Sequence, residues 1–281
     1  MGSSGAHEAP VRPFAHPLHP GGGPSGVVVL MYHGVGQATS RGEEYYTVSE
    51  EAFAAQVAAL RGRVASYAEL LKGRAAPGSI VLTFDDGERS VYTHAFPLLR
   101  EQGLSATVFV TTAWIDAEGY LSADEIVALR DAGWIIGAHG VTHRFLSDLP
   151  DAELHEELAA SRDALRTILG EPVAHMSLPG GRESPRVLAA VRAAGYRSLC
   201  TSRMGLTPAR CDPYRVRRMM VVRPYDLRRF RRIIDGDLRL YFAMRARDEL
   251  LGAAKRLLGN DRYVALRLRA FALAERLRSR R

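Results

Sequence analysis

The chain has 281 residues and is 47% hydrophobic, which is ample for one large core. Its two cysteines, Cys200 and Cys211, exclude a disulfide framework and fit a reducing compartment. The net charge of +7 is uneven, because residues 1–211 carry 18 Lys and Arg against 23 Asp and Glu, whereas residues 212–281 carry 20 against 8. The basic end favours either an anionic or phosphate-bearing partner or a solvated arginine-rich surface, and no nucleic-acid partner is expected.

Residues 1–26 are rich in Pro, Gly, Ser and His and contain no apolar stretch. This composition predicts a disordered leader and is not that of a secretory signal. Apolar runs elsewhere are too short to span a bilayer. We therefore expect a cytoplasmic protein, peripheral on the inner face of the membrane if the basic end binds lipid.

Short apolar runs alternate with amphipathic stretches along the remaining chain. Helices are predicted over 49–62, 90–103, 122–133, 151–170 and 184–195. Strands are predicted over 27–33, 80–86, 106–112, 134–139, 175–179, 198–202 and 215–222. About seven strand–helix units predict parallel strands with right-handed crossovers, in an open sheet or a barrel. In both architectures, ligands bind at the carboxyl ends of the strands.

Three of the predicted strands end in polar residues. His33 ends the first, Asp85 and Asp86 end the second, and His139 ends the fourth, with His143 four residues later. Two adjacent carboxylates repel each other unless a cation is present. One carboxylate with two imidazoles gives the three N and O ligands of a catalytic zinc site, and the other carboxylate is then available as a general base.

Two other interpretations of the acidic pair remain open. Adjacent aspartates after a strand could hold magnesium for phosphoryl transfer, although a phosphatase of the haloacid dehalogenase type places its acids two residues apart and has no use for the histidines. The pair could also be an Asp-Gly turn without chemistry.

The segments "TFDDG", "HGVTH" and "SLPGGR", in this order, resemble the polysaccharide deacetylase family with its NodB homology domain. The resemblance covers roughly residues 26–235 and begins at "LMYHGV". It implies an α/β fold, a distorted (β/α)7 barrel of NodB type. It also implies a divalent ion, zinc above all, on Asp86, His139 and His143, with Asp85 as the general base.

The third motif departs from the family pattern. Ser177 stands where the family often has an arginine that contacts the base, and Arg182 is a candidate replacement. Gly180 stands where the family often has a tyrosine, and glycine keeps the backbone N–H for an oxyanion role. The family's Leu-x-x-His acid motif is missing, which leaves His33 as the candidate general acid or as an orienting residue.

The resemblance therefore implies a metal-dependent hydrolase that removes N-acetyl groups from amino sugars of a glycan, polysaccharide or lipid-linked glycolipid precursor, as in exopolysaccharide biosynthesis. Two alternatives stay open. One is a carbohydrate O-acetyl esterase, and the other is a non-catalytic glycan- or membrane-binding protein on the same fold.

The domain division expected is a leader over 1–26, a catalytic domain over 27–238 and a basic helical C-terminal extension over 239–281. Residues 241–281 contain 11 Lys and Arg but only 4 Asp and Glu, and apolar residues recur there at helical spacing. These helices either pack on the barrel or form a peripheral contact with an anionic membrane.

Overall fold

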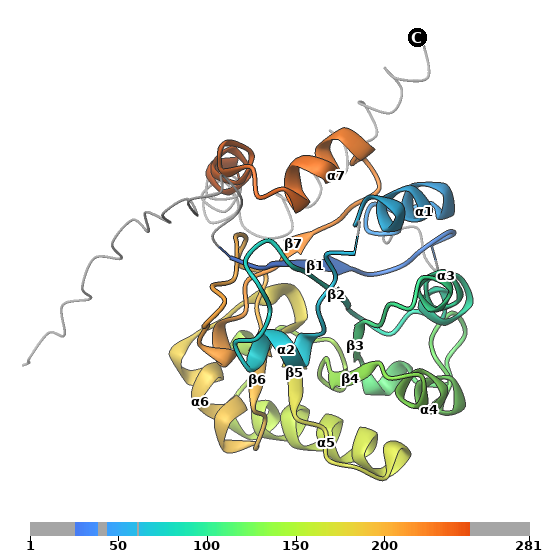
Figure 1. The fold of residues 1–281 in the computed structure, drawn as a ribbon. Coiled ribbons are helices and arrows are strands. Elements are labelled where there is room, and N and C mark those ends of the chain that lie inside the picture. The colour runs from blue at the N-terminus through green and yellow to red at the C-terminus, as the bar shows by residue number, and fades with distance from the viewer. Residues whose placement is uncertain (1–25, 39–43, 61, 248–281) are drawn as a thin grey trace, which may run out of the picture.

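The computed structural model describes residues 26–38, 44–60 and 62–247. Seven parallel strands curl into a half-barrel that helices surround, as the alternating pattern predicted (Figure 1). The strands are β1 (Val28–Tyr32), β2 (Ile80–Phe84), β3 (Thr107–Val110), β4 (Ile135–Ala138), β5 (His175–Ser177), β6 (Ser198–Cys200) and β7 (Met219–Met220).

The order of the strands in the sheet is β6-β5-β4-β3-β2-β1-β7. The predicted last strand over 215–222 is split between two neighbours, since Val216 bridges Cys200 of β6 and Met219 pairs with Leu30 of β1. This change of partner draws the two edges of the sheet together, and it explains why β7 itself is only two residues long.

The helices occupy the stretches between the strands. They are α1 (Glu50–Ala59), α2 (Tyr67–Leu71), α3 (Phe96–Glu101), α4 (Ala123–Asp131), α5 (Asp151–Leu169), α6 (Pro185–Ala193) and α7 (Leu227–Ile234). The predicted helix over 90–103 begins with a π-helical turn, and α2 and α7 were not predicted. Serine side chains cap α1, α4 and α6, with a capping box at Ser122 and Glu125.

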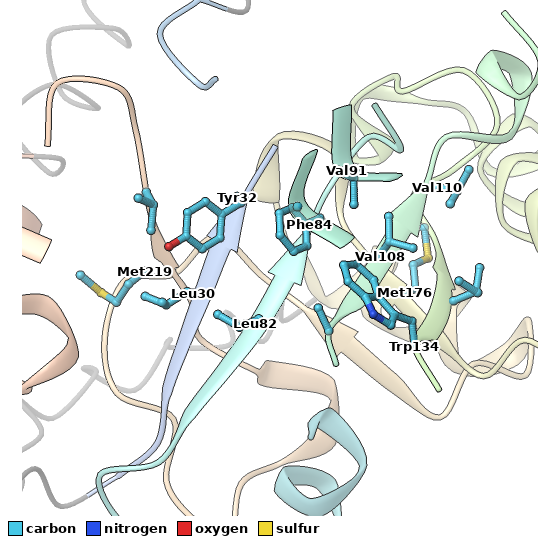
Figure 2. Packing of buried hydrophobic residues seen from close by; sticks show 14 of the residues in the cluster. Leu30, Tyr32, Leu82, Phe84, Val91, Val108, Val110, Trp134, Met176 and Met219 are labelled. Carbon is cyan, nitrogen blue, oxygen red and sulfur yellow. The ribbon is translucent and has the colours of Figure 1, made fainter. Parts of the chain in front are cut away.

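Alternation along the strands divides the core into two layers. Residues of one parity pack outward against the helices, and Tyr32, Phe84 and Trp134 form a row there with ring centroids 5.4 and 5.7 Å apart (Figure 2). The other parity points into the half-barrel, where Val81 belongs to a smaller apolar cluster. Inward-facing side chains thus form rows that lead to the carboxyl edge of the sheet.

The predicted leader, up to residue 25, and the basic segment from residue 248 onward lie outside the described residues. Both cysteines are free. Within the part of the chain that the structure describes, no helix is both long and apolar enough to cross a bilayer.

Candidate active site

The acidic pair lies directly after β2, at the carboxyl edge of the half-barrel. Strand alternation makes Asp85 the last member of the inward-facing row that contains Val81 and Thr83, and it is 3% exposed. Asp86 has a positive φ of 72°, which turns its carboxylate away from that of Asp85. A left-handed aspartate beside a buried one is a strained arrangement of the kind found at functional sites.

Asp86, His139 and His143 bring three ligand atoms together within 4.8 Å of one another. The Oδ1 atom of Asp86 lies 3.3 Å from Nε2 of His139 and 3.2 Å from Nε2 of His143. This oxygen is buried and accepts no hydrogen bond of good geometry among the described residues. A buried carboxylate oxygen that faces two imidazole nitrogens fits a divalent cation bound between them, and the N, N and O donors match zinc chemistry.

Each histidine is held by the loop that carries it. His139 follows β4, and its Nδ1 lies 2.8 Å from the backbone oxygen of Ser177, which favours the tautomer that leaves Nε2 free toward Asp86. His143 adopts a φ of 60° and packs its ring against Trp114, with centroids 5.1 Å apart. Contacts within the protein therefore orient both imidazole rings.

The first test removes one imidazole at a time. We expect His139→Ala and His143→Ala each to lose the bound ion on dialysis, because a site with three protein ligands cannot spare one. Elemental analysis of the dialysed proteins measures the retained metal. His94→Ala, which changes an imidazole elsewhere on the surface, is the matched control. Full metal content in either of the two site variants would rule out this ligand set.

Glu157 on α5 fixes the loop between the two histidines. Its Oε2 accepts the backbone N–H of Val141 at 2.6 Å and that of Thr142 at 3.1 Å, and its Oε1 accepts the Thr142 hydroxyl. A Cβ on Gly140 would lie 3.0 Å from the same carboxylate, so this close approach favours glycine there. Glu157 was not predicted, because the histidine motif marks only the loop and gives no sign of the helix residue that binds it.

The charge of Glu157 can be removed without changing its shape. We expect Glu157→Gln to weaken zinc affinity by about ten- to a hundred-fold, the range typical of groups that support metal ligands. The change should appear in a zinc titration against a chromophoric chelator. Glu153→Gln, one turn earlier on α5 and paired with Arg144 at the surface, is the control. Equal zinc affinities in the two variants would show that the loop holds its shape without the carboxylate.

Arg218 was not predicted and is the most deeply placed charge of the site. It is 1% exposed and lies just before β7, with Nη1 2.6 Å from Oδ1 of Asp85 and Nη2 2.7 Å from Oδ2. Its Nη2 also donates to Ser177 Oγ, which itself donates to Asp85, and its Nε donates to the backbone oxygen of Thr201. Burial alone would raise the pKa of Asp85, but the guanidinium holds it below its usual value, so this carboxylate stays ionised.

Arg218 corrects the expectation that Arg182 would replace the family's arginine. The guanidinium of Arg182 lies over the ring of Phe145 at 3.9 Å and donates to Asp148 at the surface. Ser177, which stands where the family often has its arginine, contributes a hydroxyl to the same carboxylate. The Asp85 carboxylate is therefore bound by Ser177 at the end of β5 and by Arg218 just before β7.

Gly180 lies in the turn after β5 with a φ of 61°. A Cβ at this position would meet the ring of Phe145 at 2.2 Å, so only glycine fits. The preceding Pro179 packs close to Gly140 of the histidine loop, which places this turn beside the metal ligands. No distance ties the N–H of Gly180 to an oxyanion position, and its proposed role stays a prediction.

His33 lies after β1, on the same edge of the half-barrel. Its ring packs against Tyr46 with centroids 5.0 Å apart, and its Nδ1 is buried without a hydrogen bond to any described residue. Burial lowers the pKa of His33, and the carboxylates of Asp86 and Asp85 only partly oppose this effect. The imidazole is therefore neutral near pH 7, which is the weaker form for a proton donor.

The half-barrel thus places an Asp-His-His cluster that could hold a metal ion beside an arginine-bound aspartate. The family model described as polysaccharide deacetylase matches residues 72–199, which include the acidic pair, both histidines and Gly180. His33 and Arg218 lie outside the matched range. Residues 72–199 therefore match the polysaccharide deacetylase family, and the resemblance predicted from the motifs is confirmed.

This chain is also similar to individual polysaccharide deacetylases in structure and in sequence. The crystal structure of a polysaccharide deacetylase from Bacillus cereus superimposes with a TM-score of 0.66 at 26% identity, over 74% of this chain and 69% of that one. YxkH of Bacillus subtilis, provisionally named a polysaccharide deacetylase, is 24% identical over 206 residues, which are 70% of this chain and 72% of the relative. The poly-β-1,6-N-acetyl-D-glucosamine N-deacetylase of Staphylococcus aureus is 26% identical over 117 residues, 35% of this chain and 40% of the relative.

Proposed function

We propose that this chain is a metal-dependent N-deacetylase of glycans that contain N-acetylated amino sugars. The observation that carries the proposal is the division of labour between adjacent carboxylates. Asp86 faces two imidazole nitrogens at 3.2 and 3.3 Å, whereas Asp85 faces away from them and is bound by Arg218. The poly-N-acetylglucosamine deacetylase among the relatives supports this class of substrate.

Asp86, His139 and His143 would hold the ion, which we propose to be Zn²⁺. Such an ion supplies Lewis acidity, which makes water more acidic and polarises the acetyl carbonyl. The protein residues around it have separate tasks. The histidine rings are oriented by the backbone oxygen of Ser177 and by the face of Trp114. The half-buried edge leaves one side of the cluster for substrate, because His143 is 32% exposed and His139 only 2%.

Asp85 is the proposed general base. Arg218 and Ser177 occupy part of its lone pairs, and a carboxylate has about four acceptor sites, so at least one is left for the proton of the attacking water. The N–H of Gly180 is the proposed donor to the oxyanion that forms when water adds to the amide carbon. Loss of the amine then needs one proton, which the carboxyl group of Asp85 can return.

His33 is the alternative source of that proton. Its neutral imidazole can donate only after it has taken a proton itself, and the two nearby carboxylates favour that uptake. A role in orienting substrate through the Tyr46 contact is equally consistent with its position.

The proposal is tested by assaying amide and ester substrates side by side. Zinc-loaded protein is incubated with N-acetylglucosamine oligomers and with an O-acetylated sugar, and both released acetate and new free amines are measured. We expect acetate and amine to appear in equal amounts from the oligomers. Acetate from the ester alone would identify an O-acetyl esterase, and no product from either would favour a binding protein on this fold.

A further inference from the structure

A second surface of the molecule combines positive charge with exposed apolar side chains. After α7 the chain forms a helix over residues 238–247, whose first turn is capped by Asp237. Leu240, Tyr241 and Met244 face the core, whereas Leu238 and Phe242 are 40% and 77% exposed. These two are the large apolar side chains exposed in the described part of the chain, and their spacing of four places them on one face of the helix.

Arginines surround this apolar pair. Residues 223–247 contain eight arginines against three aspartates and no other charge. Asp235 and Asp237 are paired with Arg63 and Arg232, and Asp226 caps α7. The side chains of Arg228, Arg231 and Arg239 are exposed, and no ion pair engages them among the described residues.

We propose that this basic-apolar surface, formed by Leu238, Phe242, Arg228, Arg231 and Arg239, binds an anionic phospholipid membrane. A soluble polyanion would use the arginines but gain nothing from an exposed phenylalanine, whereas an interfacial site uses both. Cationic side chains bind lipid headgroups, and the apolar pair enters the boundary between headgroups and acyl chains. The charge complementarity and the exposed apolar pair both lie on described residues.

The part of this surface on the helix over residues 238–247 lies away from the catalytic edge, whereas Arg228 lies in the first turn of α7, soon after the carboxyl end of β7. Arg63, which pairs with Asp235 at the end of α7, directly precedes Val64, the bridge partner of the first residue of β2. Arg245 lies within electrostatic range of Arg217, whose N–H donates to Thr207, the bridge partner of Val27 before β1. Both contacts place the end of α7 and the helix over residues 238–247 near the amino ends of β1 and β2 (Figure 1).

This placement has a consequence for substrate, which rests on the proposed deacetylase function. A membrane bound through Leu238, Phe242 and Arg239 leaves the proposed metal ligands, at the carboxyl ends of the strands, facing away from the bilayer. The enzyme would then act on a glycan that extends from the membrane or approaches from the aqueous side. A sugar held flat against the same patch of lipid would not reach the site.

Vesicle binding by the full chain tests the surface. We expect co-sedimentation with vesicles of phosphatidylcholine and phosphatidylserine, and none with phosphatidylcholine alone. Arg231→Gln with Arg239→Gln should lower the partition coefficient about thirty-fold. Phe242→Ser should lower it about tenfold. The control is Arg100→Gln with Arg166→Gln, which removes two exposed charges from α3 and α5.

Three results would overturn the proposal. The first is no binding by the full chain, and the second is equal binding by the paired variants and their control, which would assign any affinity to other residues. The third is loss of binding in the arginine variant with no effect of Phe242→Ser, which would indicate a site for soluble polyanions. Thermal melts of each variant verify that these losses do not arise from unfolding.

The orientation has its own readout, independent of enzymatic activity. In a Phe242→Trp variant, brominated lipids should quench the new tryptophan. In the unaltered chain they should leave fluorescence unchanged, because Trp134 is buried and Trp114 lies against His143 at the catalytic edge. Quenching in the unaltered chain would show that the catalytic edge, not the basic-apolar surface, meets the membrane.

Discussion

Asp85→Asn should abolish nearly all deacetylation while the protein keeps its metal. The amide retains the shape of the carboxylate but cannot take a proton from water, and loss of a positioned base costs about 10² to 10⁴ in rate. The ligands Asp86, His139 and His143 are unchanged, so zinc content should stay at the level of the unaltered chain. Acetate release and elemental analysis on the same sample measure both quantities.

The neighbouring substitution is the matched comparison. Asp86→Asn should lose zinc, because it replaces the anionic carboxylate that lies between the two imidazole nitrogens with a neutral amide, which is a much weaker metal ligand. The opposite pattern, with metal lost in the Asp85 variant and kept in the Asp86 variant, would mean that the two carboxylates have exchanged roles. Thermal stability is followed in parallel, since Asp85→Asn also leaves the Arg218 guanidinium without its anionic partner.

Arg218→Met should destabilise the fold and change how activity depends on pH. Breaking a buried ion pair by removing one partner typically costs about 3–5 kcal/mol. With the guanidinium gone, burial is no longer opposed and should raise the pKa of Asp85. The acidic limb of kcat/KM should therefore move to higher pH, because the base is ionised only above its own pKa. Chemical denaturation and a pH profile measure the two effects.

The stability of the unaltered chain should also decrease at acidic pH. In the unaltered chain the pKa of Asp85 is below its usual value, so its pairing stabilises the fold fully above the ordinary aspartate range, about 3.9. That contribution is lost as pH falls through the lowered pKa of the folded state. Arg182→Met is the control, because its side chain is bound at the surface to Asp148. Equal stability and equal pH profiles in the two arginine variants would contradict the role given to Arg218.

That Asp86, His139 and His143 lie together could be predicted from sequence, because the first two lie at strand ends and His143 follows four residues after His139. Parallel strands bring their carboxyl ends to one edge, so Asp86 after β2 and His139 after β4 had to lie near each other. Repulsion between the adjacent carboxylates indicated a bound cation. The two histidines, four residues apart, were the candidates for its other ligands. Resemblance to a family then separated the roles of Asp85 and Asp86, which repulsion between the carboxylates alone could not do.

Arg218 could not be placed in the same way. It lies 133 residues from Asp85, and its contact depends on a long side chain that points inward from a strand shared between β6 and β1. A signal was present, because Arg217 and Arg218 interrupt a segment predicted as a buried apolar strand. A charge inside such a strand needs a partner, and the unpaired acid at the end of β2 was available. Glu157 gave no comparable signal, because charged residues are common on an amphipathic helix such as α5.

The dependence of acetate release on bound zinc tests the central claim most directly. Metal-free protein is reconstituted with increasing zinc, and acetate from N-acetylglucosamine oligomers is measured at each ratio of ion to chain. The arrangement of Asp86, His139 and His143 predicts negligible release without metal and a rise that saturates near about one ion per chain. Full deacetylation by metal-free protein, or saturation with zinc without any acetate release, would contradict the assignment of this site as a metal-dependent deacetylase centre.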